Sequence, residues 1–540
     1  MPSTPTTKSQ VQAYRFVLRR MQSALVRKDA VMLHDPMRTH SRATIVGVCI
    51  AALGLLGFLI WGILSPKPKT PDKDGIVIGK PSGQVYVLIA QPDKKLVPVF
   101  NLASARLLLM AQQQEKSEDP QASNAAKAAA GNVTVVAPTV VDDNELKDIP
   151  KGRKVGIADG PDLLPSADQR IESRWTVCDQ YILDRGLTES ASKDEVETTV
   201  IAGVSDLGAE LKQDESLLVE APDGVRYLVY RTPGTANLPN TSAVRAKVDL
   251  DRPEVLAALS LNDVRPRKIT TGMLNAIPEK VPLATPDIPG RGDDSNVNLD
   301  DRDLRKVGSV FKVERAGNIT RYYVVLRDGV QEVKETTADL LRYFDNPGAP
   351  TIKAVNPDQM TNVPQPKEID DRTYPESATE VLDPENFPVA CLGWSASGEG
   401  ANAQEHTSVH IGKALPGVGL NSDGTPKSVA ISTPSADGTR IDHFYMPPGR
   451  GAVVRQATSK EDFTKGQITL ISDRGVKYGV PDGPTAAGLG LNDQKPAPRS
   501  IIQLLPDGAS LSVQDVRQSY DSTPFEGGQY PSAAPSDGGG

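Results

Sequence analysis

Cysteine, histidine and aromatic residues are scarce in this sequence. Its 540 residues include 3 Cys and 5 His, and aromatic residues make up 5% of it. So few cysteines exclude a disulfide-dense scaffold and the zinc sites that need four cysteines. Glycine and proline, in contrast, number 45 and 44. This composition predicts many turns and short elements around modest cores.

Recognisable catalytic motifs are also lacking. No G-x-x-x-x-G-K-[ST] phosphate loop is present. Ser190 and Lys193 match S-x-x-K, but no K-T-G accompanies them. His406 and His410 lie four residues apart without the glutamate of a zinc-binding H-E-x-x-H helix, so we interpret them as residues on one face of a strand. We expect no catalytic, cofactor-binding or metal-binding site.

Only one stretch of the chain is both long and apolar. Residues 43–64, ATIVGVCIAALGLLGFLIWGIL, carry no charge. A helix of this length extends roughly 33 Å at ~1.5 Å per residue, enough to cross the ~30 Å hydrocarbon core of a bilayer. The alternative, a buried core helix, fits an uncharged run of this length poorly. The sequence therefore predicts a single-pass membrane protein.

The charges on either side of this stretch predict its orientation. Residues 1–42 contain eight basic and two acidic side chains. Subtracting them from the chain's 60 basic and 68 acidic residues leaves 52 against 66. By the positive-inside rule the N-terminus is cytoplasmic, and the bulk of the chain lies outside the cytoplasm. We expect the helix to remain as an anchor, because residues 65–67 offer no small-x-small cleavage site.

Two cysteines, Cys178 and Cys391, lie in the outer region, while Cys49 lies within the apolar stretch. An even pair in an oxidising compartment favours a disulfide, with two separate buried thiols as the alternative. If the two are bonded, the domain that contains them is assembled from pieces far apart in the sequence.

Four segments of the outer region share one pattern. Each has a glycine, a β-like run with a tyrosine, a helix of mostly small residues, and an aliphatic residue followed by proline. The members are Gly83, Tyr86, residues 101–109 and Ile149-Pro150; Gly224, Tyr227, residues 252–261 and Ile277-Pro278; Gly317, Tyr322, residues 336–344 and Val363-Pro364; and Gly475, Tyr478, residues 485–491 and Leu505-Pro506. The variable spacing excludes a solenoid of fixed period and predicts duplicated small α+β modules with insertions in their loops.

These observations divide the chain into nine parts. We expect an elongated outer α+β region in which four repeat modules surround a mainly β core closed by the disulfide. The parts are a cytoplasmic basic amphipathic helix (1–42), a transmembrane helix (43–64), a linker and repeat 1 (65–165), the first part of the core (166–220), repeat 2 (221–290), repeat 3 (300–366), the second part of the core (376–465), repeat 4 (466–516) and a disordered tail (517–540).

The cytoplasmic segment carries a stripe of large apolar residues at helical spacing. The stripe consists of Val11, Tyr14, Leu18, Met21 and Leu25. Basic residues occupy mostly the other faces, which predicts an amphipathic helix. Such a helix would lie on the anionic inner leaflet or dock on partner subunits; a flank that only sets the topology is the third alternative.

Several runs of the sequence resemble those of EccB, a core component of the type VII (ESX) secretion systems of mycobacteria and related actinobacteria. The runs are QVQAYRFVLRRMQSALVRKDAVMLHDP, NLASARL, LNAIPE, YMPPGRG and YGVPD, in this order between residues 10 and 482. The resemblance implies a complex with EccC, EccD and EccE in the inner membrane, often with a mycosin protease. It also implies self-association through a periplasmic region of four repeats around a core, and no nucleic-acid partner.

The resemblance favours a structural subunit of a secretion complex. Family members are sometimes labelled ATPases, so an extracytoplasmic nucleotide hydrolase is the alternative. It would need an unusual phosphate site, for example in the loop Gly449-Arg450-Gly451. A cell-wall-binding module is a third possibility, because small β-rich repeats can hold glycans.

Overall fold

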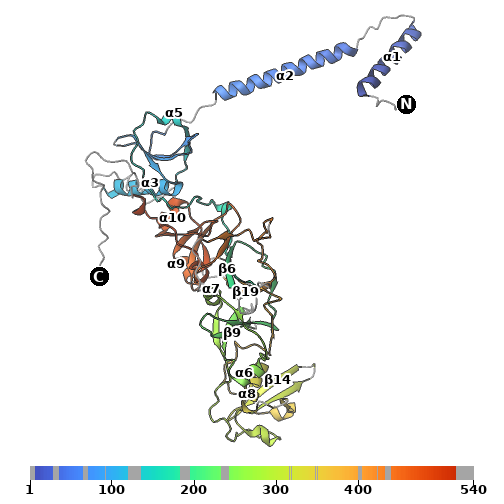
Figure 1. Cartoon of the computed structure of the whole chain (residues 1–540), viewed down its shortest axis with the longest axis vertical. Coiled ribbons are helices and arrows are strands. Elements are labelled where there is room, and N and C mark those ends of the chain that lie inside the picture. Colours follow the sequence, from blue (N-terminus) through green and yellow to red (C-terminus); the bar gives the residue numbers. More distant parts are fainter. Residues whose placement is uncertain are drawn as a thin grey trace. The chain divides into compact units, whose positions relative to one another are not determined.

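A computed structural model gives the structure of the chain (Figure 1). It describes residues 7–27, 36–64, 71–91, 93–118, 135–182, 195–232, 243–315, 317, 319–346, 348, 351–398, 404–422, 424–431 and 439–517. The chain forms two compact units, Met1–Lys69 and Thr70–Gly540. Ser190 and Lys193 lie outside the described residues.

In the first unit, the described residues form two helices, α1 (Lys8–Arg27) and α2 (Pro36–Leu64). Pro36 opens α2, where its missing N–H costs no helical hydrogen bond. Within α2, Arg42–Gly62 is the one described segment that is long and apolar enough to cross a membrane, and its residues are exposed. The described residues therefore contain one candidate span near the N-terminus, as the sequence predicts.

The described residues of the second unit form an α+β structure with five sheets. Four of them share one connectivity: a three-stranded antiparallel meander, then a helix, then a strand that pairs in parallel with the first strand. The first sheet contains β1 (Gly75–Lys80), β2 (Val85–Ile89), β3 (Lys95–Val99), α3 (Leu102–Glu118) and β4 (Thr139–Asp142), followed by the short α5 (Asp143–Leu146).

The other three sheets of this kind follow in the sequence. The second contains β8 (Glu215–Glu220), β9 (Arg226–Arg231), β10 (Ala243–Val248), α6 (Pro253–Ala258) and β11 (Arg267–Lys268), with α7 (Thr271–Ala276), β12 (Glu279–Leu283) and β17 (Glu380–Val381) added. The third contains β13 (Val310–Arg315), β14 (Ile319–Val325), β15 (Val330–Val333), α8 (Glu335–Asp345) and β16 (Lys353–Ala354). The fourth contains β22 (Ala452–Ala457), α9 (Asp462–Lys465), β23 (Ile468–Ile471), β24 (Lys477–Val480), α10 (Gly483–Leu489) and β25 (Lys495–Pro498), followed by α11 (Arg499–Ile502) and η5 (Asp515–Arg517).

The glycines of the sequence pattern lie in hairpin turns. Gly83, Gly224, Gly317 and Gly475 have φ angles of 69°, 79°, 89° and 80°, a left-handed conformation that favours glycine. The first three glycines precede the second strand of their sheets. Gly475 precedes the third strand, β24, so the sequence pattern places the fourth segment one hairpin later than the others.

The prolines of the pattern also have a shared structural position. The carbonyl oxygens of Pro150, Pro278, Pro364 and Pro506 accept hydrogen bonds from the third strand of their sheets, from the amides of Leu96, Arg245, Val330 and Lys477, at 2.8, 2.9, 2.9 and 3.0 Å. The chain after each helix is therefore fastened to the edge of its own meander.

The fifth sheet has seven strands in the order β20-β21-β6-β5-β18-β19-β7. They are β5 (Arg174–Ile182), β6 (Glu195–Ala202), β7 (Ala209–Glu210), β18 (Val389–Ser397), β19 (Gln404–Gly412), β20 (Val429–Ala430) and β21 (His443–Tyr445). Its neighbouring strands β5 and β18 come from segments about two hundred residues apart and are joined by the disulfide Cys178–Cys391. The predicted disulfide is confirmed.

Hydrophobic clusters connect sheets that are distant in the sequence. One cluster combines Leu107 of α3 with Leu489 of α10. Another combines Val255 of α6 with Leu340 of α8. The largest surrounds Trp175 of the seven-stranded sheet and includes residues of α7 and α11. The first and fourth sheets therefore share a core, and so do the second and third.

Two elements differ from the sequence-based boundaries. Helix α3 extends to Glu118, well beyond the predicted residues 101–109. Strand β22 pairs with β23 and β25 rather than with the seven-stranded sheet, so a division at residue 466 falls inside the fourth sheet. The alternation of polar and apolar residues predicts that this segment is a strand, but it does not identify the strands with which it pairs.

Candidate functional site

The disulfide lies in a row of side chains that crosses the seven-stranded sheet. In the strand register, Cys391 is opposite both Cys178 and His410, and Cys178 is also opposite Thr199. Directly paired residues point to the same face of a sheet. The Sγ atoms of the two cysteines are 2.07 Å apart, and both cysteines are buried.

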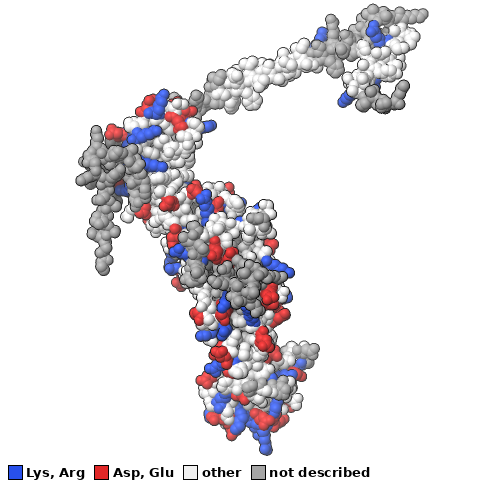
Figure 2. All heavy atoms as spheres, in the orientation of Figure 1, with Lys and Arg blue, Asp and Glu red and all other residues white. Residues whose placement is uncertain are grey.

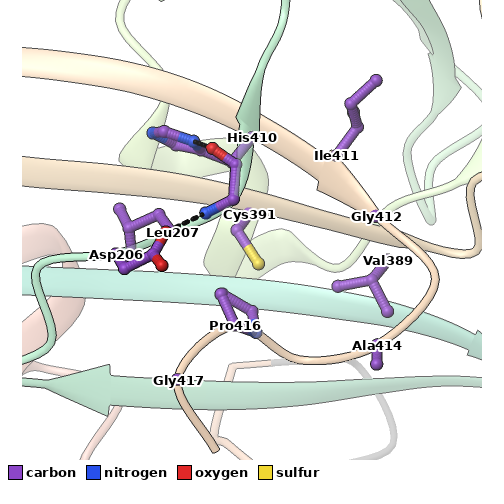
Figure 3. A pocket seen from close by; sticks show the side chains of 11 residues that line it. Asp206, Leu207, Val389, Cys391, His410, Ile411, Gly412, Ala414, Pro416 and Gly417 are labelled. Carbon is purple, nitrogen blue, oxygen red and sulfur yellow. Dashed lines mark hydrogen bonds between the residues drawn. The ribbon is translucent and has the colours of Figure 1, made fainter.

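A pocket of about 190 Å³ opens beside this row (Figure 3). Figure 3 shows the Cys391 sulfur pointing into it, with Pro416 and Val389 nearby. The lining residues are Asp206, Leu207, Gly208, Val389, Cys391, His410, Ile411, Gly412, Ala414, Pro416 and Gly417. Gly417 has a φ of 65°, and a Cβ there would lie 2.3 Å from Val204 Cγ1. The pocket is smaller than typical small-molecule sites and has mostly apolar walls.

His410 is the one imidazole in this lining, and its two ring nitrogens are both occupied. Nε2 lies 2.8 Å from Ser408 Oγ, and Nδ1 lies 3.2 Å from the carbonyl oxygen of Gly208. Burial lowers the pKa of His410 and favours the neutral ring. His406 lies in β19 as well, as the sequence predicts. Among the described residues, no group of three His, Cys, Asp or Glu side chains is arranged to hold a metal ion.

On β5, one residue after Cys178, the buried carboxylate of Asp179 fastens helix α7 to the sheet. Its Oδ1 accepts hydrogen bonds from the hydroxyls of Thr198 and Thr270, both at 2.9 Å, and its Oδ2 accepts one from the Thr270 amide at 2.7 Å. Burial raises the pKa of Asp179 to about 6, although these hydrogen bonds and the positive charge of Arg267 oppose the rise. The guanidinium of Arg267 donates to the carbonyl oxygens of Phe387 and Pro388, at 3.1 and 3.0 Å.

The loop Gly449-Arg450-Gly451, considered as a phosphate site, is engaged in other contacts. Arg450 donates to the main-chain oxygen of Asp168. The Gly449 amide points to the carboxylate of Asp473 at 3.4 Å, a charge that would repel a phosphate. Within the described residues this loop therefore acts as a structural connection.

Helix α1 presents its apolar stripe without cover. Tyr14 is 66% exposed, Met21 55% and Leu25 77%, and Val11 and Leu18 are exposed as well. Side chains of this kind normally enter a core, a membrane or an interface. Arg15 and Arg19 are exposed on the same helix.

Sequence reasoning missed Asp179 and Arg267. Asp179 occupies a strand position next to Cys178, but nothing in the local pattern marks it as buried. Its three hydrogen-bond donors come from β6 and from the start of α7, so only the tertiary structure shows that the carboxylate is satisfied.

Known proteins resemble this chain both in sequence and in fold. Residues 3–525 match the protein family described as type VII secretion system ESX-1, transport TM domain B. The chain is similar to the ESX-1 secretion system ATPase EccB1 of Mycolicibacterium smegmatis, at 28% identity over 96% of each chain. Two similar folds, each with a TM-score of 0.64, occur in an intact ESX-5 inner membrane complex (23% identity, 99% of each chain covered) and in the EccB3 dimer of an ESX-3 core complex (24% identity, 83% of this chain and 100% of that one).

Proposed function

The chain belongs to the type VII secretion family whose members are named EccB, and from this premise we propose that it is a structural subunit of an ESX inner membrane complex. In this role it anchors the complex through α2 and docks on partner subunits through α1. The expected partners are the membrane subunits EccC, EccD and EccE, with a mycosin protease as a further candidate. The chain also associates with copies of itself through the unit that begins at Thr70.

One observation carries the proposal most directly: the exposed stripe of α1. Residues 1–42 are too few to form a hydrophobic core, so the stripe cannot be buried within its own segment. Its exposed tyrosine, methionine and leucine side chains match the anchors of a helix that docks in a groove. The basic residues before α2 support a cytoplasmic position for this helix.

The recurring connectivity supports the interpretation of four repeat modules. Four sheets have the same order of meander, helix and parallel strand, and their prolines accept the same main-chain hydrogen bond. We place the start of the fourth module at β22, near residue 452, rather than at 466. Self-association of the unit beginning at Thr70 is supported by the similar fold of the EccB3 dimer.

The experiment tests whether α1 docks on protein. Substituting L18D and M21D together in the full chain should abolish co-purification of EccC, EccD and EccE and stop secretion. The matched control is R15E with R19E on the same helix. All four residues are exposed, so neither variant should lower the stability of the unit beginning at Thr70.

Docking on protein and binding to the leaflet predict different effects for the two double variants. If the helix lies on the anionic leaflet, R15E/R19E should reduce secretion more than L18D/M21D does. The partner subunits should then still co-purify with both variants. Retention of all partners in L18D/M21D would contradict docking through the stripe.

Relatives such as EccB1 are named ATPases. No contact among the described residues of this chain favours nucleotide hydrolysis. Arg450 is engaged by Asp168, and the neighbouring amide faces a carboxylate. The cell-wall alternative likewise has no supporting contact within the described residues.

A further inference from the structure

A strip of basic side chains runs along one edge of the first sheet. It combines the start of β3 with the segment Lys147–Lys154, KDIPKGRK. Its members are Lys94, Lys95, Lys147, Lys151, Arg153 and Lys154, against the acidic Asp93 and Asp148. We call these six residues the basic strip.

Main-chain hydrogen bonds create this strip from two segments about fifty residues apart. The Leu96 amide donates to the carbonyl of Pro150 at 2.8 Å, and the Gly152 amide donates back to Leu96 at 2.7 Å. The Val155 amide donates to Pro98 at 3.1 Å. Residues 151–155 therefore run beside β3, and the basic residues of both segments lie on the same edge.

Lys94 is paired with the Asp72 carboxylate at 3.6 Å, but several other cations of the strip have no acidic partner among the described residues. Among the described residues, no carboxylate lies within ion-pair distance of Lys95, Lys147 or Lys151, all of them exposed. The Lys151 ammonium lies 5.5 Å from the ring centre of Tyr86, and that of Lys154 lies 4.0 Å from the ring of Phe100. Aromatic rings hold these cations in place without neutralising their charge.

The position of the strip in the chain limits what it can meet. Strand β1 begins at Gly75, and α2 ends at Leu64. The ten residues between them allow a separation of at most about 40 Å when fully extended. The first sheet is thus the sheet of this unit that follows α2 most closely in the sequence. In Figure 2, basic side chains reach the surface of the part that carries α5, together with acidic ones.

We propose that the basic strip binds the phosphate-bearing headgroups of anionic phospholipids in the outer leaflet of the membrane that α2 spans. The strip is basic, whereas the outer region as a whole is acidic. Its lysines are therefore complementary to a membrane surface in which each anionic headgroup carries one negative charge. The proposal rests on the orientation given under the proposed function, but it does not depend on any partner subunit.

The test uses the full chain alone, reconstituted in vesicles of phosphatidylcholine with or without 30% phosphatidylglycerol. A water-soluble acylating reagent and mass spectrometry give the reactivity of each lysine. Lys247 and Lys280, exposed in the second sheet, are the matched controls. We expect Lys95, Lys147 and Lys151 to react at least fivefold more slowly in the anionic vesicles, relative to the controls.

Further arms identify the ligand. High salt should restore the reactivity, because attraction to a charged surface is screened. In the variant K147Q/K151Q/K154Q, the protection of Lys95 should fall to that of the controls. Equal reactivity in both vesicles would overturn the proposal, and so would the same protection by inorganic phosphate with neutral vesicles. Either outcome would leave docking of α1 untouched.

Discussion

Arg106 of α3 donates a hydrogen bond from Nη1 to the carbonyl oxygen of Leu489, the last residue of α10, at 2.6 Å. The two residues are 383 positions apart. The final carbonyls of a helix have no partner within it and carry a partial negative charge, so a guanidinium satisfies both needs. Arg170 adds a second hydrogen bond at the same helix end, to the oxygen of Gly490 at 2.6 Å. The first and fourth sheets are therefore joined by charge as well as by their shared hydrophobic core.

Replacing Arg106 by alanine should loosen this connection. A hydrogen bond from a charged group contributes about 2 kcal/mol, and the helix end would lose one of its two guanidinium partners. We expect faster hydrogen exchange of the amides in α3 and α10, with the seven-stranded sheet unaffected. The control is R252A, because Arg252 is exposed and its ion pairs in the described residues are with the nearby Asp249 and Glu254. Equal exchange in both variants would contradict a role for Arg106 in joining the sheets.

Removing the disulfide should destabilise the outer unit. The bridge closes a loop with a sequence separation of 213 residues, and loss of a native disulfide typically costs about 2–5 kcal/mol. Replacing Cys178 and Cys391 by alanine should lower the melting temperature measured by calorimetry, whereas C49A should not. If alkylation in intact cells traps Cys178 and Cys391 as free thiols, the assignment of this unit to an oxidising compartment would be wrong.

Stability should depend on the protonation of Asp179. Its folded-state pKa, about 6, lies above the ordinary value of 3.8 because burial disfavours the charged carboxylate. The folded state therefore holds an extra proton between these two pH values. The stabilisation from this proton is present below pH 3.8 and is lost as the pH rises through 6, a change on the order of 3 kcal/mol.

The variant D179N provides the reference, since asparagine has nearly the same shape and does not titrate. Chemical denaturation of both proteins at pH 4.5 and pH 7 gives two differences in unfolding free energy. We expect the wild type to lose stability relative to D179N as the pH rises. A constant difference would show that burial of this carboxylate does not govern its titration.

Local sequence features account for the individual elements. The glycines at 83, 224 and 317 identify hairpin turns because a left-handed backbone favours glycine, and the small-residue segments form the helices that follow. The disulfide was predictable because the outer region has an even number of cysteines and its charge predicts an oxidising compartment. The burial of Asp179 and the contact of Arg106 were not, because their partners come from other segments and leave no trace in the local pattern.

The amino-acid sequence is sufficient to predict the single apolar span, the charge difference between its two flanks, the short α+β elements and the family. These depend on composition and local spacing, which the chain carries in every conformation. The folded chain was needed to show which sheets share a core, that β22 joins β23 rather than the seven-stranded sheet, and that β3 and the segment Lys147–Lys154 form one basic edge. Such pairings depend on contacts between distant segments, and a strand's own residues specify the face that is buried but not the partner that covers it.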